Sequence, residues 1–184
     1  QQMLGRFALA ARLAESTRTD SAIFSARQNR LAPQRCVAVG LAPAKGARGA
    51  RIAEEAQATF GPAGVGITPD TQADINGYLA DHGVAFGLCT CVPRDDGSRI
   101  DMTVRAWPIE FVWWDESERV FKTTTREGGE ERIVHGDGRW IVFQEHEVQP
   151  WKNGALIATA LVWARHAFGV RDWAKSSSAH GNAK

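Results

Sequence analysis

The chain has 184 residues, 43% of them hydrophobic, and its 22 basic and 21 acidic side chains give a net charge of +1. A chain of this length can bury a core as one domain, or as one domain with a projecting element. The near-neutral charge excludes a general attraction to nucleic acid, so any DNA contact depends on where individual cations lie. No apolar run approaches the roughly 20 residues that span a bilayer, so we expect no membrane partner.

The first part of the chain has a helical pattern. Residues 4–15 are rich in Ala, Leu and Arg, which favour a helix. Asp20 is placed to cap a second helix that continues through residue 31. Pro33 has no N–H to donate, and we expect it to stop that helix.

The next segment adds a strand and two further helices. Apolar residues alternate over residues 36–41, which predicts a strand, and recur at helical spacing over residues 50–60. The sequence Thr68-Pro69-Asp70 then predicts a helix start, because Thr caps, Pro suits the first turn and Asp favours the positive end of the helix dipole. This helix is expected to end near Gly83.

Residues 84–146 have the pattern of strands. Residues 84–92 and 100–106 alternate in polarity on either side of a polar turn, which predicts a hairpin. Gly-rich or acidic breaks separate the strands expected after it. These strands cover residues 109–114, 120–125, 132–135 and 139–143. The predicted fold is therefore α+β, with a helical N-terminal part packed on an antiparallel β meander and followed by a long C-terminal helix.

The C-terminal helix is expected over residues 152–179. An apolar stripe runs along one face at 3.6-residue periodicity. It consists of Leu156, Ala160, Trp163, Ala164, Ala167 and Val170. Arg165, Gly169, Asp172 and Ser176 share the opposite face. The phase breaks after Gly169, where a bend or the close approach of another helix is expected.

Tryptophan is frequent, with seven residues, and several of them are candidates for an interface. Trp113 and Trp114 are adjacent on a strand, so their rings point to opposite faces. One ring in the core and one partly exposed would account for the pair, and so would one ring at a contact with another chain. The candidate interface aromatics are Trp113, Trp114, Trp151, Trp163 and Trp173.

The C-terminal segment carries a family resemblance. It contains Pro150-Trp151-Lys152-Asn153-Gly154, then a helix-forming run, then Val170-Arg171-Asp172-Trp173. This order resembles the portal proteins of Mu-like tailed bacteriophages. Further similarity follows in the same order along nearly the whole chain, at residues 20–30, 37–41, 77–91, 106–108 and 139–143.

The resemblance implies a wing-like α+β domain over residues 1–150, and a first stem helix with the entry to the clip over residues 151–184. Because the chain begins at Gln1 and stops at Lys184, just beyond a helical run, we expect the remainder of a longer protein downstream. Such a subunit forms a dodecameric ring at one capsid vertex of the virion, after assembly in the host cytoplasm. Its implied partners are double-stranded DNA, terminase, the major capsid protein and a head–tail adaptor, and the resemblance implies a structural protein rather than an enzyme.

Three cations of the C-terminal helix are candidates for contact with DNA or with a neighbouring subunit. They are Arg165, Arg171 and Lys175. Arg171 and Lys175 are four residues apart and adjacent on the helix surface. Arg165 aligns with Asp172, and an ion pair within the helix or between subunits is one expected use of it.

Two other classes of function stay open at this point. A metal-dependent hydrolase could use residues clustered around the last strand, since histidines and carboxylates bind metals when the fold brings them together. These are His135, Asp137, His146 and either Glu145 or Glu147. The chain lacks the common zinc-protease, phosphate-loop and nucleophile-elbow motifs, so we expect no catalytic residue, metal or cofactor. A tail or baseplate module without DNA contact is the second alternative.

Overall fold

The computed structural model describes residues 7–35, 42–43, 45–60, 66–93, 100–125, 128–144 and 149–181. Within these residues the fold is α+β, with four helices, then two small antiparallel sheets, then one long C-terminal helix. The predicted fold class is confirmed. The strand predicted over residues 36–41 lies outside the described residues.

The first two helices are α1 (Phe7–Thr17) and α2 (Ser21–Arg35). Asp20 caps α2 as predicted, because its Oδ1 accepts hydrogen bonds from the backbone N–H groups of Ala22 at 2.9 Å and Ile23 at 3.2 Å. The expectation that Pro33 stops this helix was wrong, since α2 continues past it. A proline removes only its own N–H, so the residues after it can still complete the last turn.

Helix α3 (Ala47–Phe60) matches the helix predicted over residues 50–60 but starts earlier, and none of its residues is buried. Helix α4 (Pro69–His82) has both of its predicted ends. Thr68 accepts a hydrogen bond from the backbone N–H of Thr71 at 3.2 Å, and Gly83 closes the helix with φ of 73°. A left-handed φ favours glycine, so the local sequence alone specifies where α4 stops.

The strands form two three-stranded sheets rather than one continuous meander. In one sheet, β1 (Val84–Pro93) lies between β2 (Ile100–Trp107) and β6 (Trp140–Gln144). In the other, β3 (Val112–Asp115), β4 (Val120–Thr124) and β5 (Glu130–Ile133) follow in chain order. The hairpin of β1 and β2 and the meander from β3 to β5 agree with the sequence.

Two details of the strands differ from the prediction. Strand β6 pairs with β1, with Phe86 opposite Val142, so the last strand leaves the meander and closes the first sheet. The strand expected over residues 109–114 begins with a 3-10 turn, Ile109–Phe111, and only then becomes β3. Pro108 precedes this turn with φ of −62°, a value that its ring fixes.

The core lies where the two sheets and α1 meet. Its fully or nearly fully buried members are Phe7, Val84, Phe86, Ile109, Val112, Phe121, Ile133 and Trp140. Trp107 of β2 connects the sheets, because its Nε1 donates to Thr123 Oγ1 of β4 at 2.8 Å and its ring meets that of Trp140 edge-on at 5.4 Å. Aromatic edge contacts of this kind add to the hydrophobic stabilisation of the core.

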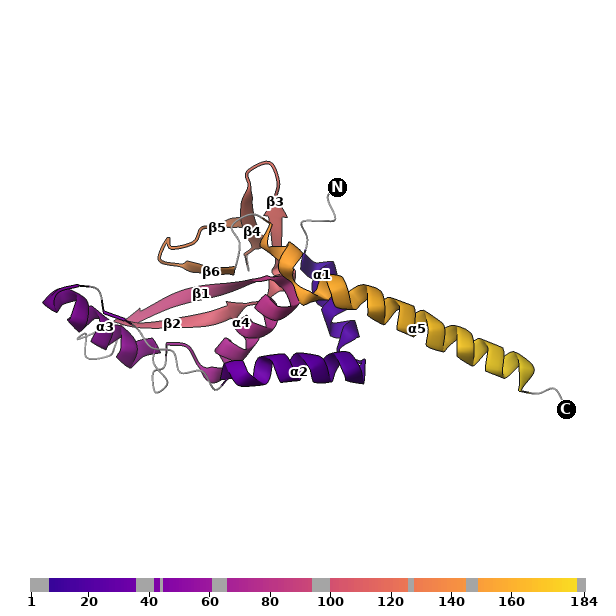
Figure 1. The fold of residues 1–184 in the computed structure, drawn as a ribbon. Coiled ribbons are helices and arrows are strands. Elements are labelled where there is room, and N and C mark those ends of the chain that lie inside the picture. The colour runs from indigo at the N-terminus through magenta and orange to yellow at the C-terminus, as the bar shows by residue number, and fades with distance from the viewer. Residues whose placement is uncertain are drawn as a thin grey trace.

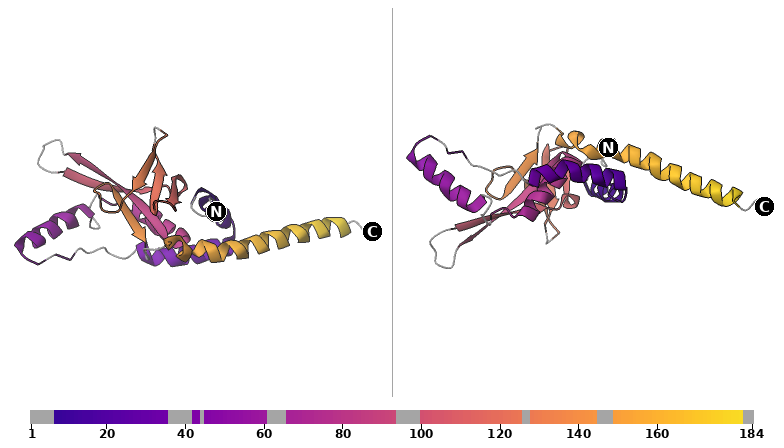
Figure 2. Two further views of the ribbon diagram at one scale, coloured as in Figure 1. Left: turned by 90° about the horizontal axis from the view of Figure 1, so that it is seen from above. Right: turned by 60° about the horizontal axis from the view of Figure 1, so that its bottom comes forward.

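A single helix gives the molecule its elongated shape. Helix α5 (Ala155–His180) has 26 residues and runs away from the body, so that the C-terminal end of the described chain lies far from the sheets (Figure 1). Two further views show the same projection, with α3 at the opposite end of the molecule (Figure 2). The chain therefore combines a packed α+β body with one projecting helix.

Candidate assembly surface

The start of α5 is held against the end of α4 by two glycines. A 3-10 turn, Pro150–Asn153, leads into the helix. A Cβ on Gly83 would overlap the carbonyl oxygen of Pro150, and a Cβ on Gly154 would overlap the carbonyl oxygen of Asp81. Only glycine fits at both positions, so the two backbones meet closely and the direction in which α5 leaves the body is defined.

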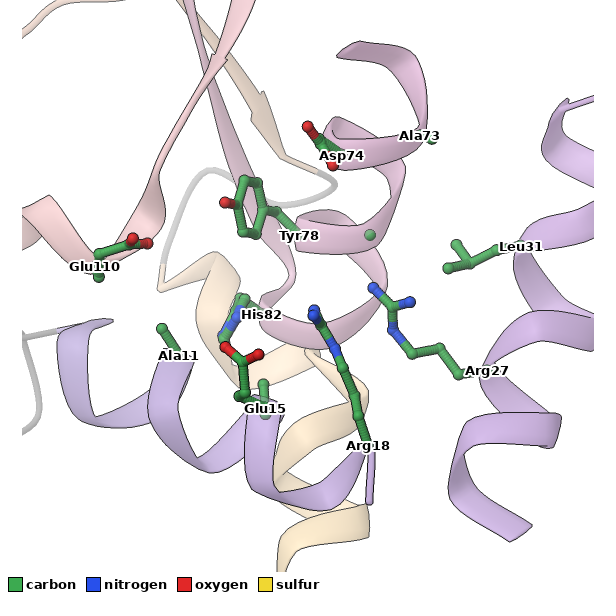
Figure 3. Close-up of a pocket in the computed structure, with 12 residues that line it drawn as sticks. Ala11, Glu15, Arg18, Arg27, Leu31, Ala73, Asp74, Tyr78, His82 and Glu110 are labelled. Carbon is green, nitrogen blue, oxygen red and sulfur yellow. The ribbon is translucent and has the colours of Figure 1, made fainter. Parts of the chain in front are cut away.

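A polar cavity of about 270 Å³ opens beside this junction, between α1, α2 and α4 (Figure 3). Arg18 and Arg27 line one side of it. Tyr78 and His82 of α4 lie in the middle, and three carboxylates complete the lining. These carboxylates are Glu15, Asp74 and Glu110.

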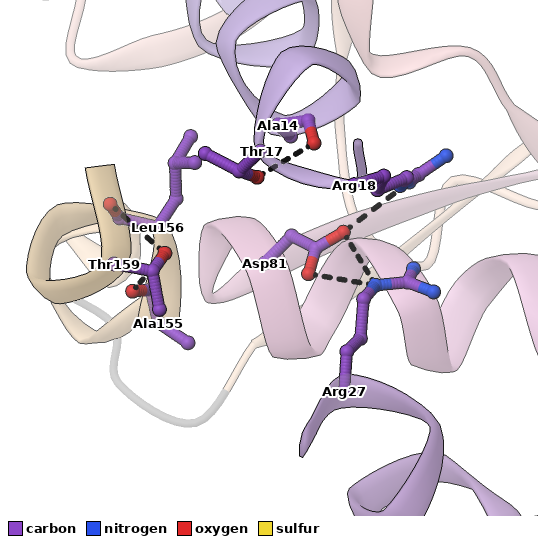
Figure 4. Close-up of polar contacts among 8 residues, drawn as sticks. All are labelled: Ala14, Thr17, Arg18, Arg27, Asp81, Ala155, Leu156 and Thr159. Carbon is purple, nitrogen blue, oxygen red and sulfur yellow. Dashed lines mark hydrogen bonds and ion pairs between the residues drawn. The ribbon is translucent and has the colours of Figure 1, made fainter. Parts of the chain in front are cut away.

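One carboxylate of α4 ties the three helices together next to this cavity. Asp81 receives Arg27 Nε at 3.0 Å and Arg18 Nη2 at 3.3 Å, so α2 and α1 both join α4 through it (Figure 4). The side chains of Asp81 and Arg27 are only 13% and 18% exposed. Mostly buried charges of this kind are costly to separate, which makes this pair part of the support for α5.

The first turns of α5 pack on the body. Leu156 is 8% exposed, and Figure 4 shows it beside Thr17 of α1. Farther along, His166 Nδ1 lies 2.9 Å from Asp20 Oδ2, so the carboxylate that caps α2 also contacts α5. The hydrogen bond with His166 is the main reason that the pKa of Asp20 falls below its usual value. Beyond His166 every side chain through residue 178 is exposed.

The first two-thirds of the predicted apolar stripe of α5 faces the body rather than a free surface. Leu156 is buried, and Ala160, Trp163 and Ala164 are half-buried. Only its last members, Ala167 and Val170, are exposed. The stripe read from the sequence is thus largely used inside the chain, and the free apolar surface lies elsewhere on the helix.

Apart from Val170, the large exposed apolar side chains of α5 lie on two other flanks. Flank 1 consists of Ile157, Leu161 and Phe168, which are 60%, 57% and 56% exposed. Flank 2 consists of Val162 and Trp173, which are 62% and 72% exposed. At about 100° per residue the two flanks lie roughly 130° apart around the helix axis. Sequence reasoning missed them, although the spacing of Ile157, Leu161 and Phe168 by four and seven residues was a usable signal.

The three predicted cations of α5 are all exposed, but they are used differently. Arg171 Nε lies 3.7 Å from Asp172 Oδ1, and its guanidinium stands over the ring of Phe168 at 4.8 Å. Within the helix, Asp172 therefore pairs with its neighbour Arg171 and not with Arg165, and a pairing of Arg165 between subunits stays a prediction. In the described part of the chain, neither Arg165 nor Lys175 has an ion-pair partner.

The five predicted interface aromatics divide between the core and the surface. Trp114 and Trp151 are half-buried and pack against the core, with ring centroids 5.4 Å apart. Trp113 and Trp163 are half-buried. Only Trp173 is largely exposed. Of the adjacent pair on β3, Trp114 is the ring that packs against the core, and a contact of either ring with another chain stays a prediction.

The residues considered for metal chemistry have structural contacts where the chain is described. His135 Nδ1 accepts the backbone N–H of Val142 at 3.1 Å, and Asp137 Oδ1 accepts those of Arg139 at 2.8 Å and Trp140 at 2.7 Å. Glu145, His146 and Glu147 lie outside the described residues. Among the residues that are described, no group of three or more His, Cys, Asp or Glu side chains is arranged to hold a metal ion.

No family model matches the chain, and no curated protein matches it. Within the described residues, no helix is both long and apolar enough to cross a membrane.

Proposed function

We propose that this chain is a subunit of a ring-shaped phage portal, in which residues 1–150 form the wing-like body and α5 is the stem helix around a DNA tunnel. One observation carries the proposal. Helix α5 projects from a completed body and bears unpartnered apolar side chains on both of its flanks. The sequence resemblance to Mu-like portal proteins supports the same function.

Two separated flanks favour a ring over a twofold dimer. In a cyclic ring each subunit meets one neighbour through one surface and the other neighbour through a different surface. A twofold dimer of helices needs only one such surface, because the same residues meet across the axis. Flank 1 and flank 2 of α5 supply two different surfaces on a single helix.

The cations of α5 are the proposed contacts with DNA phosphates. Arg165 lies on the polar face between the two flanks, where neighbouring copies would leave it uncovered, and Arg171 and Lys175 lie nearer to flank 1. DNA must slide through a tunnel, so these contacts are few, weak and sensitive to salt. We expect Arg171→Ala with Lys175→Ala to lower packaging yield modestly while rings still form. The terminase, capsid and adaptor contacts belong to the same proposal.

The decisive experiment measures association of flank variants by light scattering over a range of concentrations. The flank-1 variant carries Leu161→Gln and Phe168→Gln, and the flank-2 variant carries Val162→Gln and Trp173→Gln. A ring contact joins flank 1 of one copy to flank 2 of the next. Because every copy of a given variant has lost the same flank, neither variant should form a large assembly on its own. Ala158→Gln, on the exposed polar face between the flanks, is the matched control and should assemble like the parent chain.

Mixing the two variants separates a ring from a dimer. The intact flank 2 of one variant fits the intact flank 1 of the other, so the mixture should stop at a heterodimer. If one variant still forms homodimers as stable as those of the parent chain, contact is twofold and the ring is excluded. If the parent chain itself stays monomeric at high concentration, the result favours the alternative function, a tail or baseplate module.

A further inference from the structure

We propose that the cavity between α1, α2 and α4 binds a cation that carries N–H donors, an alkylammonium or alkylguanidinium group, through the carboxylates of Glu15, Asp74 and Glu110. The cavity is separate from both flanks of α5, and the inference does not depend on ring assembly. It rests on the charges of the residues that line the cavity, on the burial of His82 and on the volume of the cavity.

The first observation is the balance of charge. Glu15, Asp74 and Glu110 come from α1, α4 and the turn before β3, and none of them has an ion-pair partner in the part of the chain that is described. The lining also contains Arg18 and Arg27, but both are already paired with Asp81. The lining thus carries three unpaired carboxylates and two guanidiniums whose charges are shared with Asp81 beside the cavity, so the cavity favours a positively charged guest.

The second observation is a buried imidazole without a hydrogen bond. His82 lines the cavity and is 4% exposed, and among the described residues neither of its ring nitrogens has a hydrogen-bond partner. Buried polar side chains are nearly always hydrogen-bonded, so this ring lacks a partner that a guest can provide. Burial lowers the pKa of His82 to about 4, which leaves the ring neutral at pH 7 with one nitrogen free to accept an N–H.

The third observation concerns Tyr78, which lies near Asp74, Glu110 and His82, while Glu15 lies on the other side of His82 (Figure 3). Burial raises the pKa of Tyr78, and the negative charges of Glu110 and Asp74 raise it further. The same negative field that disfavours a tyrosinate favours a cation at this place. Figure 3 also shows the carboxylate of Glu110 directed across the cavity toward Tyr78.

The volume limits the guest to a small group. At about 270 Å³ the cavity lies just below the range of roughly 300–1,000 Å³ that is usual for ligand pockets. It can therefore take a single lysine or arginine side chain or a small free amine, but not a nucleotide. The source of the cation is either a basic side chain of a second copy of this chain or a free small molecule.

Tyr78 gives a specific probe because it is the only tyrosine of the chain. The protein is labelled with ring-¹³C tyrosine and titrated with methylguanidinium chloride at constant ionic strength. We expect the single tyrosine signal to shift and saturate. Tetramethylammonium chloride, which has the same charge but no N–H donor, should cause no saturable shift.

Variants connect the signal to the carboxylates. Asp74→Asn with Glu110→Gln should weaken the binding of methylguanidinium by about tenfold or more, because charged hydrogen bonds are lost. Glu54→Gln with Glu130→Gln removes the same charge from positions that are equally exposed but do not line the cavity, and should leave binding unchanged. Equal binding by both double variants, a shift that never saturates, or an equal response to tetramethylammonium would overturn the proposal.

The same titration, repeated at several protein concentrations, identifies the source of the natural guest. If a basic side chain of a second copy occupies the cavity, it competes with methylguanidinium, and the apparent affinity falls as the protein concentration rises. If the guest is a free molecule, the affinity stays constant. Both results support a cation site, and they differ only in the origin of the cation.

Discussion

The body and the outer half of α5 place the same kind of side chain in opposite surroundings. Phe121 of β4 is 6% exposed, whereas Phe168 of α5 is 56% exposed. The ring of Phe121 meets those of Trp114 at 4.8 Å and Phe86 at 4.9 Å. Phe168 meets only the guanidinium of Arg171, at 4.8 Å, among the contacts of the described chain.

This contrast indicates that folding and association depend on different parts of the molecule. The body completes its core with its own aromatic side chains, so its stability is internal. The helix beyond His166 contributes exposed apolar area that the chain itself does not cover, and such area promotes association. Substitutions in the two regions should therefore change different measured quantities.

The largest expected effect is on the free energy of unfolding, when a phenylalanine is replaced by alanine once in the body and once in the outer half of α5. Phe121→Ala should lower the free energy of unfolding by about 3–5 kcal/mol, because it leaves a cavity in the core. Phe168→Ala removes the same atoms from an exposed site and should change that free energy by about 0.5 kcal/mol or less. Urea unfolding, followed by tryptophan fluorescence at low protein concentration, measures both values.

Association should respond in the opposite order. Phe168→Ala is expected to weaken self-association of the folded chain in light scattering, since it lies on flank 1. Equal losses of unfolding free energy for the two variants would show that α5 folds back on the body in solution and that the contrast between the regions is wrong.

The second effect concerns the support at the base of α5. Asp81→Asn leaves Arg18 and Arg27 without their shared carboxylate, and we expect a loss of about 2 kcal/mol in the free energy of unfolding. Glu54→Gln on α3 makes the same chemical change at an exposed position and should have almost no effect. Thermal unfolding measured by circular dichroism compares the two. A similar small change in both would mean that solvent screens the Asp81 pairs.

Local sequence signals predicted much of the fold. The Thr68 cap, the Gly83 terminus and the hairpin of β1 and β2 all follow from a few neighbouring residues, and the structure confirms them. Pro33 shows the limit of one such signal, because its effect depends on how near the helix end it lies. Features that depend only on neighbouring residues, such as helix caps and hairpins, could therefore be predicted from the sequence.

Features that join distant segments could not be predicted in the same way. The pairing of β6 with β1 crosses the whole meander, and no local pattern encodes it. Apolar residues occur on three sides of α5, so periodicity alone could not show that the Leu156 stripe faces the body. The cavity lining also comes from separate elements, since Glu15, Asp74 and Glu110 share no sequence motif.

A third, smaller effect is expected at Gly169, where a substitution should act differently on the stability of the monomer and on its association. A Cβ on Gly169 would meet no atom within 4 Å, so nothing within the described chain requires glycine there. Gly169→Ala should stabilise the chain by about 0.5–1 kcal/mol through helix propensity. If a neighbouring copy approaches at this point, the same substitution should weaken association while it raises thermal stability. Loss of stability in the monomer would instead indicate a contact inside the chain.

The smallest effect tests the point where α5 last contacts the body. The hydrogen bond with His166 lowers the pKa of Asp20, and the backbone N–H groups of Ile23 and Ala22 lower it further. The ionised carboxylate therefore adds stability that is fully present above its unfolded pKa, near 3.8, and is lost as the pH falls through the lower folded value.

Asp20→Asn keeps a capping side chain but cannot ionise, so its deficit in unfolding free energy relative to the parent chain should be constant above about pH 5 and should shrink in more acidic solution. His166→Gln should reduce the same acid-dependent contribution, because it removes the main cause of the lowered pKa. Urea unfolding at several pH values between about 2 and 6 measures these differences, which should be small because His166 is exposed. Identical pH profiles for the parent chain and both variants would mean that the contact between Asp20 and His166 does not hold α5 to the body.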